Sequence, residues 1–431
     1  MYRLVATYAR VLARGFYRPH LTGGSIPADG PLILVTNHTN GLADAAVLIL
    51  LTGRPLRFLA KYKIFEMPFV GTLARWVGAV PVFRQKDHVD MTRNVDAFRA
   101  IHATLRRREV ISIFPEGSSE TVPALRKLKT GAARMALGAE TEGDGPIGVR
   151  IVPVGLVYQR RDHWRSRVDV WVGEPFGVDE FLDDYVRDDR QSVIDLTARI
   201  ERGLREVTLE LDDLSDRLLL GIAEELLPED GRALPARLQE LARGLTWLRR
   251  ARPDRAQELA RRLTALGTAP DVRPAPARPV SALVAVGAAA LATLTMPPWL
   301  PPAALARALA LAKRPTVDKF VTALLLISSF ALPAWWILVS VLAWTLWGPM
   351  PAAIAAGWLL TSAPIAACLW SRRAVWATHW RAATDPQGTR SRAQEREALR
   401  REVGRLSRLA LRLASRDQGR AAEQTADRSA R

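Results

Sequence analysis

The spacing of apolar residues changes repeatedly between residues 26 and 184. Short continuous apolar runs, typical of buried strands, occur in "PLILVTN", "VISIFPEG", "VRIVPVGLVY" and "RVDVWVGEPF". Residues 91–109 and 129–140, which lie between such runs, have apolar positions at helical spacing. Because strands alternate with helices, the pattern predicts an α/β fold: a layered domain with a mostly parallel sheet flanked by helices.

The segments around this domain are predicted to be helical. Residues 1–25 indicate an N-terminal amphipathic helix, which either lies on a membrane surface or covers the next domain. Residues 185–268 have Leu, Arg and Glu at helical spacing and predict a helical segment. Residues 269–280 are rich in proline and predict a semi-rigid linker.

The chain becomes strongly apolar after the linker, and residues 281–371 predict a membrane region. Residues 320–370 carry no charged side chain, and this length is enough for two crossings, with a break at "WGPMP". Tryptophans near the expected interfaces agree with this interpretation. The uncharged stretch at residues 279–306 is shorter and contains "MPPWLPP", which favours a re-entrant or interfacial segment.

Charge determines the expected orientation and partners. The net charge is +17, and from residue 371 onward there are 15 arginines against 7 acidic residues, so residues 372–431 predict a basic helical tail. Because positive segments stay in the cytoplasm, we expect the inner (cytoplasmic) membrane as location, the layered domain of residues 26–184 on its cytoplasmic side, and anionic lipids as partners. The same charge and apolar segments would also suit a protein that binds anionic lipid without catalysing a reaction, which is the alternative function from another class.

Neither nucleic acid nor a metal ion is expected as a ligand. No helix-turn-helix, RRM or zinc pattern occurs in the sequence. The single cysteine, Cys368, excludes an intramolecular disulfide and a cysteine-rich metal site.

The candidate chemistry begins in "NHTNGLAD", where Asp44 follows His38 by six positions. Such positions lie on different faces of a continuous helix, but the stretch Asn37–Gly41 favours a turn. A turn would bring the Asp44 carboxylate to one imidazole nitrogen and leave the other as a general base for a hydroxyl. The alternative is a helix-capping aspartate beside a surface histidine.

Three more motifs follow in order: "GAVPVFR", "FPEGSSE" and "VPVGLVY". With "NHTNGLAD" they resemble the glycerolipid acyltransferases, the family of glycerol-3-phosphate and 1-acylglycerol-3-phosphate acyltransferases. The resemblance covers residues 20–180 and implies transfer of a fatty acyl group from acyl-CoA or acyl-ACP to a phosphorylated glycerol acceptor. The thioester is a substrate, and no cofactor is expected.

The resemblance implies a role for individual residues. His38 would be the general base and Asp44 its partner, and Arg84 would bind the acceptor's phosphate. Glu116 and Gly117 would shape the acceptor site, and Pro153 would belong to the fourth motif. Lys129 precedes a predicted helix, where it is either an anion-binding residue or a solvated surface lysine. A serine hydrolase using Ser118 or Ser119 is disfavoured because no G-x-S-x-G motif occurs.

Two departures bear on the acceptor. Five residues separate His38 from Asp44, where the common family pattern has four, and Ser118-Ser119-Glu120 stands where the lysophosphatidate branch often has Thr-Arg-Ser. Both differences favour glycerol-3-phosphate as acceptor, with lysophosphatidate as the alternative. The donor, the acyl chain length and the oligomeric state are left open by the sequence.

Overall fold

The computed structural model describes residues 1–83, 93–120, 124–143, 145–213, 215–227, 234–266, 278–312 and 316–429. The chain divides into two compact units. The first unit consists of residues 1–208 and 303–332, and the second of residues 209–302 and 333–431.

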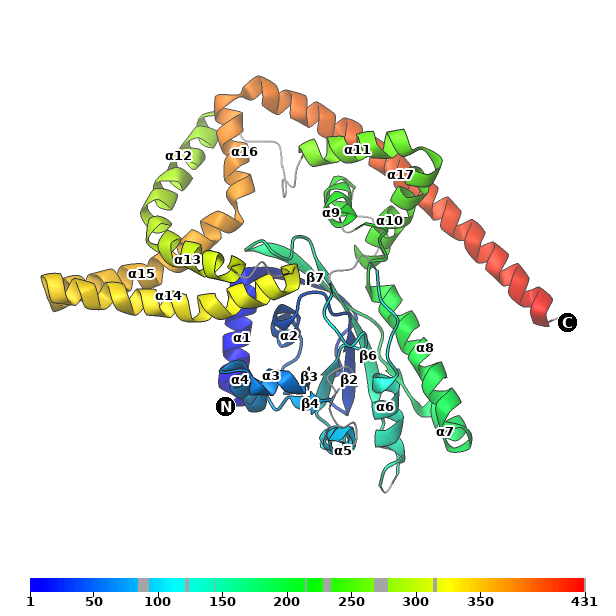
Figure 1. Ribbon diagram of the computed structural model, residues 1–431. Helices are drawn as coiled ribbons and strands as arrows, with labels where there is room; N and C mark the ends of the chain where they lie inside the picture. The colour runs from blue at the N-terminus through cyan, green and yellow to red at the C-terminus, as the bar shows by residue number, and fades with distance from the viewer. Residues whose placement is uncertain are drawn as a thin grey trace. The chain divides into compact units, whose positions relative to one another are not determined.

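The first unit is built on one mixed sheet (Figure 1). Its strands are β1 (Tyr17–Gly23), β2 (Leu32–Thr36), β3 (Leu56–Lys61), β4 (Val80–Val82), β5 (Val110–Ile113), β6 (Arg150–Tyr158), β7 (Ser166–Val172) and β8 (Phe176–Gly177). The order across the sheet is β1-β7-β6-β2-β5-β3-β4, and β8 also pairs with β6.

The strands β6, β2, β5, β3 and β4 are mutually parallel, whereas β7 is antiparallel to β6 and parallel to β1. The predicted α/β fold with a mostly parallel sheet is therefore confirmed. Because parallel strands end at the same edge and β2 is next to β5, the segments that follow these two strands leave the sheet side by side. They carry the motifs "NHTNGLAD" and "FPEGSSE", whereas "GAVPVFR" includes β4 and ends outside the described residues.

One face of the sheet is covered by the helices α1 (Tyr2–Phe16), α2 (Leu42–Leu48) and the start of α14 (Val317–Trp347). Side chains of β2 and β6 pack there against buried residues of these helices. The buried contributors from α14 are Phe320, Val321 and Leu325. This core therefore joins residues separated by about three hundred positions in the sequence.

The opposite face is covered by α5 (Arg93–Arg106), α6 (Gly131–Thr141) and α8 (Asp189–Val207) (Figure 1). Ile33 and Ile151 are fully buried, and they alternate along their strands with residues that face α1 and α2. The short helices α3 (Tyr62–Glu66) and α4 (Val70–Trp76) connect β3 to β4. The 3-10 turn η2 (Asp179–Phe181) and α7 (Leu182–Arg187) lead into α8.

The N-terminal amphipathic helix ends earlier than the segment 1–25 for which it is predicted. The helix α1 ends at Phe16, and residues Tyr17–Gly23 form the strand β1, which pairs in parallel with β7. Pro19 is tolerated there because β1 is the edge strand of the sheet.

Among the described residues of the second unit, the secondary structure elements are all helices, joined by short non-helical segments. It contains α9 (Asp216–Leu226), α10 (Leu234–Ala251), α11 (Pro253–Leu266), α12 (Arg278–Thr295), η3 (Pro297–Trp299), α15 (Pro349–Ser371), α16 (Arg373–Thr384) and α17 (Pro386–Ser429). The helices α9, α10 and α11 pack against α17. Arg262 of α11 pairs there with Glu395 at 2.7 Å and Glu402 at 2.8 Å.

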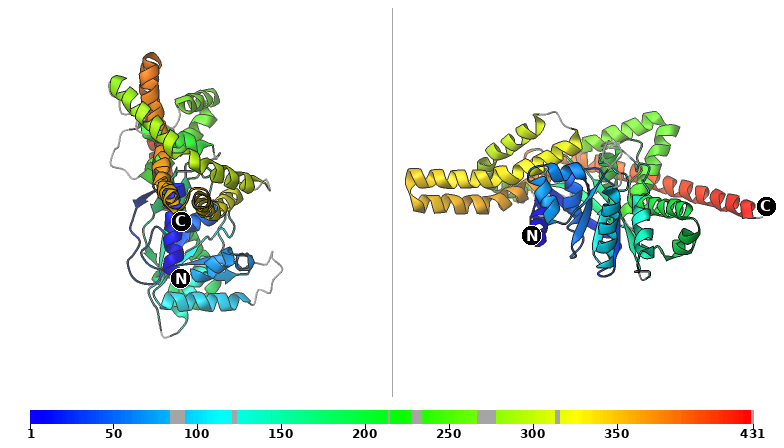
Figure 2. Two further views of the ribbon diagram at one scale, coloured as in Figure 1. Left: turned by 90° about the vertical axis from the view of Figure 1, so that its left-hand side faces the viewer. Right: turned by 60° about the horizontal axis from the view of Figure 1, so that its bottom comes forward.

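Two described helices are long and apolar enough to cross a membrane, at residues Lys319–Trp347 and Pro349–Trp370. The second half of α14 lies beside α15 (Figures 1 and 2), and the Trp336 indole donates to the Ala356 carbonyl at 3.1 Å. The preceding apolar stretch is interrupted by η3, which separates α12 from α13 (Leu300–Leu311). Counting that bent pair as one span would give up to three crossings.

Glycines let α8 lie close to β6. A Cβ on Gly155 would collide with the main-chain carbonyl of Val207, and a Cβ on Gly203 would be 2.8 Å from the Pro153 ring. A side chain at either position therefore requires the helix to move away from the strand.

We predict that Gly155→Ala lowers the free energy of unfolding by about 2–3 kcal/mol, since backbone cannot yield as a flexible side chain can. The matched control is Gly53→Ala, because an added Cβ there has nothing within 4 Å. Thermal unfolding of the purified variants measures the effect. Equal midpoints for the two variants would show that the close approach of α8 does not constrain the fold.

Candidate active site

His38 lies directly after β2, and Asn37 fixes this position. The Asn37 side chain donates to the Leu156 carbonyl at 3.0 Å and accepts from the Leu156 N–H at 2.7 Å. The Asn37 side chain therefore makes the two hydrogen bonds to β6 that the main chain of a further β2 residue would make. The main chain itself can then turn away from the sheet at His38.

The turn brings Asp44 back to His38. The imidazole Nδ1 is 2.9 Å from Oδ2 of Asp44, a side chain in the first turn of α2 that is wholly buried. The same Oδ2 accepts the N–H groups of Thr39 at 3.0 Å and Asn40 at 2.8 Å. Gly41 has φ of +56°, a conformation that favours glycine, and it precedes the helix. The carboxylate thus holds the turn and the imidazole together.

The surroundings of the imidazole fix its plane. The Phe114 ring stacks on it, with ring centroids 3.9 Å apart and planes inclined by 17°. Because Nδ1 faces the carboxylate, Nε2 is the nitrogen directed away from it, and the His38 side chain is 17% exposed. The geometry suits a neutral imidazole with its proton on Nδ1 and a basic Nε2.

Glu116 joins the third motif to the histidine. Its carboxylate accepts the His38 main-chain N–H at 2.8 Å and the Arg126 Nε–H at 3.0 Å. Arg126 also pairs with Glu120 at 2.8 Å and contacts Ser118. Two cation contacts and a main-chain donor therefore hold this loop beside the imidazole.

The loop after Glu116 also bonds to the turn. The Ser119 hydroxyl accepts the Gly41 N–H at 3.1 Å, and the Glu120 N–H donates to the His38 carbonyl at 3.3 Å. Ser119 therefore bonds to the main chain of the turn, an arrangement that does not suit a serine nucleophile activated by His38.

Gly117 and Lys129 lie against each other. Gly117 has φ of +75°, and a Cβ there would be 2.6 Å from the Lys129 ammonium. The Lys129 N–H donates to the Pro115 carbonyl at 2.8 Å, and the exposed side chain lies just before the N-terminus of α6. A positive charge thus lies beside the loop that contacts His38.

The structure does not bring the two remaining predicted residues, Arg84 and Pro153, into the described cluster. Arg84 lies outside the described residues; Phe83, directly before it, is held by Asn94 through hydrogen bonds of 3.0 and 2.8 Å. Pro153 lies within β6 opposite Val35, and its ring is next to Gly203 of α8. The binding roles of both stay predictions.

Three contributors were not anticipated: Phe114, Arg126 and Tyr158. The Tyr158 hydroxyl donates to Asp44 Oδ1 at 2.8 Å. Phe114 is the first residue of the motif "FPEGSSE", and Tyr158 is the last residue of "VPVGLVY". Their membership of these motifs is the sequence signal that could have pointed to them. Nothing distinguishes Arg126 from the neighbouring cations in "ALRKLKT".

Within the described residues, no group of three or more His, Cys, Asp or Glu side chains is arranged to hold a metal ion. The site is therefore best described by its hydrogen bonds: a buried carboxylate, an oriented imidazole, and a loop with a cation beside it.

The arrangement lies at the carboxyl edge of a mostly parallel sheet, and its geometry is compatible with a histidine that accepts a proton. Residues 18–157 match the family model "Acyltransferase". This part of the chain is therefore similar to acyltransferase domains, and the relatives that it resembles include both glycerol-3-phosphate and 1-acylglycerol-3-phosphate acyltransferases.

Similar proteins include glycerol-3-phosphate O-acyltransferase 2 of Saccharomyces cerevisiae, 33% identical over 145 residues, or 33% of this chain and 19% of that protein. The chloroplastic 1-acyl-sn-glycerol-3-phosphate acyltransferase of Arabidopsis thaliana is 30% identical over 152 residues, 35% of this chain and 39% of that protein. The chain thus matches less than half the length of either relative. The solved 1-acyl-sn-glycerophosphate acyltransferase of Thermotoga maritima has a TM-score of 0.35 and 18% identity, covering 48% of this chain and 79% of that one.

Proposed function

We propose that this protein transfers a fatty acyl group from a thioester, acyl-CoA or acyl-ACP, to a hydroxyl of glycerol-3-phosphate in phospholipid biosynthesis. The observation that carries the proposal is the 2.9 Å contact between His38 Nδ1 and the buried Asp44 carboxylate. A histidine oriented in this way is suited to take a proton from an alcohol.

The reaction then follows from the positions of the two side chains. His38 Nε2 accepts the proton of the acceptor hydroxyl as its oxygen bonds to the thioester carbonyl carbon. The tetrahedral intermediate collapses, the carbon–sulfur bond breaks, and the leaving thiolate takes the proton from His38. Asp44 holds the tautomer and stabilises the transient imidazolium.

The acceptor is the less constrained part of the proposal. The five-residue gap before Asp44 and the Ser118-Ser119-Glu120 sequence favour glycerol-3-phosphate over lysophosphatidate. Relatives with either name are similar to this chain at comparable identity, so lysophosphatidate is the alternative acceptor. A non-catalytic lipid-binding protein is disfavoured, because binding headgroups gives no reason to bury an aspartate beside an oriented histidine.

Lys129 and Arg84 are the proposed phosphate-binding residues. The Lys129 ammonium lies over Gly117, in the loop that bonds to the His38 main chain through Glu116. A phosphate held there would keep the acceptor's hydroxyl near the imidazole, which lowers the entropic cost of reaction.

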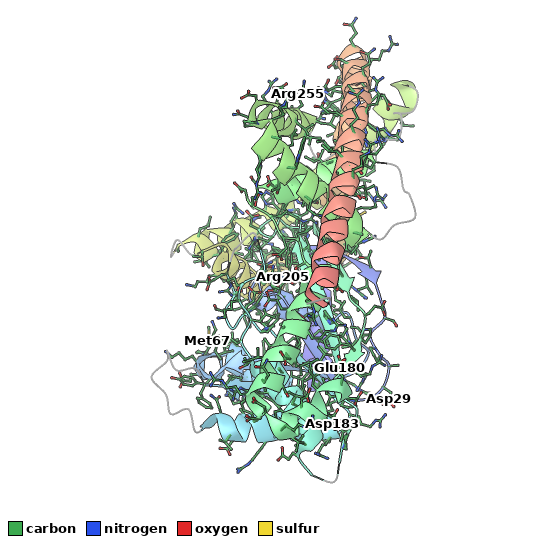
Figure 3. All side chains as sticks on the ribbon, turned by 90° about the vertical axis from the view of Figure 1, so that its right-hand side faces the viewer. Asp29, Met67, Glu180, Asp183, Arg205 and Arg255 are labelled. Carbon is green, nitrogen blue, oxygen red and sulfur yellow. The ribbon has the colours of Figure 1, made fainter. Side chains whose placement is uncertain are left out.

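We further propose that the domain works on the membrane that α14 enters. The residues Met1, Leu4, Tyr8 and Val11 form an exposed apolar stripe on α1. In the same unit Phe69 is exposed, and its ring centroid lies 5.3 Å from that of Phe330 of α14. Figure 3 shows Met67 at one margin of this unit and the acidic residues Glu180 and Asp183 away from it. An apolar surface continuous with a candidate span suits contact with lipid.

His38→Ala should lower the rate of thioester consumption with glycerol-3-phosphate by about 10³-fold or more, because base and orienting carboxylate act as a unit. His20→Ala is the control, since that histidine is 55% exposed on the edge strand β1. The assay uses labelled acyl-CoA with glycerol-3-phosphate, dihydroxyacetone phosphate and lysophosphatidate in turn. The proposal fails if His38→Ala consumes the thioester as fast as the parent protein.

Lys129→Ala should raise the KM for the phosphorylated acceptor about tenfold and leave that for the donor unchanged, since one charge-assisted contact to phosphate is lost. Arg84→Ala is expected to behave in the same way. Lys127→Ala removes an exposed lysine two positions away and serves as the control. Equal effects of Lys129→Ala and Lys127→Ala, or equal effects on both substrates, would contradict a phosphate-binding role.

The catalytic domain and the basic tail are expected on the cytoplasmic side. With Cys368 replaced by Ala, we predict that Glu180→Cys and Arg400→Cys react with a membrane-impermeant maleimide in inverted vesicles and are protected in right-side-out vesicles. Met350→Cys, at the exposed junction of α14 and α15, should show the opposite pattern. Labelling of Met350→Cys and Glu180→Cys from the same side would refute two crossings.

A further inference from the structure

Two buried tyrosines lie behind the His38–Asp44 pair. Tyr158 is the last residue of β6 and Tyr17 the first of β1, with exposed fractions of 7% and 1%. Their ring centroids are 5.0 Å apart and their planes are inclined by 61°. The two side chains therefore share one apolar environment, and they differ in what their hydroxyl groups contact.

Only one of these hydroxyls reaches the carboxylate. Tyr158 donates to Asp44 Oδ1 at 2.8 Å. The Tyr17 hydroxyl accepts from the Asn40 side chain at 2.7 Å and donates to the Arg161 carbonyl at 2.6 Å. The structure thus contains a matched pair: two phenols of similar burial, of which one bonds to the aspartate.

The donors on Asp44 are divided unequally between its oxygens. Oδ2 accepts from His38 Nδ1 and from the N–H groups of Thr39 and Asn40, whereas Oδ1 accepts from Tyr158. A carboxylate can turn about its Cβ–Cγ bond, and that rotation would move Oδ2 away from the imidazole. A donor on the opposite oxygen opposes the rotation, because turning would leave a buried oxygen without a partner.

We propose that Tyr158 is a positioning residue for acyl transfer: by donating to Asp44 Oδ1, it keeps Oδ2 directed at His38 Nδ1. The inference rests on the proposed function of the His38–Asp44 pair. Tyr158 touches no reacting atom, so it acts through Asp44. Because Tyr158 is the last residue of "VPVGLVY", the fourth motif contributes to the site through this side chain.

The environment keeps the phenol in its donating form. Burial, followed by the charge of Asp44, raises the pKa of Tyr158 well above its usual range. The titratable and charged groups around the bond are Asp44 itself, His38 on the other side of the carboxylate, and Arg161, which donates to the Thr39 carbonyl at 3.0 Å. The hydroxyl therefore retains its proton over the pH range in which a histidine base works.

The test compares Tyr158→Phe with Tyr17→Phe in the full-length protein, purified in detergent and assayed with acyl-CoA and glycerol-3-phosphate. Tyr158→Phe should lower kcat about tenfold and leave both KM values within about twofold of the parent, because substrates bind as before. Tyr17→Phe should leave kcat within about twofold. Thermal midpoints of both variants report any loss of stability separately from the rate.

A second substitution covers the case in which Tyr158→Phe does not fold. Site-specific 3-fluorotyrosine at position 158 retains the ring and the hydroxyl but makes the phenol more acidic. Because the donated hydrogen bond to Asp44 Oδ1 is retained, kcat and both KM values should stay within about twofold of the parent. A tenfold loss of kcat with the hydroxyl still present would overturn the proposal.

The outcomes separate this inference from the proposed function. If His38→Ala is as active as the parent, the proposed function fails. If His38→Ala is inactive while Tyr158→Phe retains the parental kcat, or while Tyr17→Phe loses as much kcat as Tyr158→Phe, only the positioning role fails. A tenfold loss confined to kcat and to Tyr158→Phe supports it.

Discussion

The buried carboxylate of Asp44 is the constraint on which the rest of the site depends. An ionised group out of contact with water needs several donors, and this one receives an imidazole, two main-chain amides and a phenol. Those donors come from the turn after β2 and from the end of β6. Satisfying one charge thus fixes the path of the turn, the orientation of His38 and the contact between α2 and the end of β6, so structural and chemical requirements coincide in the same atoms.

The loop after β5 adds a second set of restraints from the other side. Glu116 bonds to the His38 main chain, Ser119 bonds to Gly41, and Phe114 stacks on the imidazole. Segments about eighty residues apart are therefore connected through main-chain groups, which hold their positions better than long side chains do. The site is thus held from both sides at the edge of the parallel sheet, by contacts within the chain's own main-chain and buried groups.

Continuous apolar runs made β2, β5, β6 and β7 predictable, because these runs are short, rich in Val and Ile, and followed by residues that favour turns. The strand β1 was not, since "YRPHLTG" contains proline and polar residues and becomes a strand only by pairing with β7. Spacing suggested that His38 and Asp44 would meet. It did not reveal Tyr158, because a contact across 114 positions has no local signature. The start of α14 likewise gave an apolar signal that fits a membrane span and a domain core equally well.

That dual use of α14 has a consequence for how the protein is made. Phe320, Val321 and Leu325 complete the core behind α1 and α2, although they lie more than a hundred residues beyond α8. A nascent chain in which the whole sheet has been synthesised still lacks this covering and exposes apolar side chains until α14 emerges. Folding of the domain is therefore coupled to delivery of α14, and a chain cut after residue 208 would be a poor substitute for the natural domain.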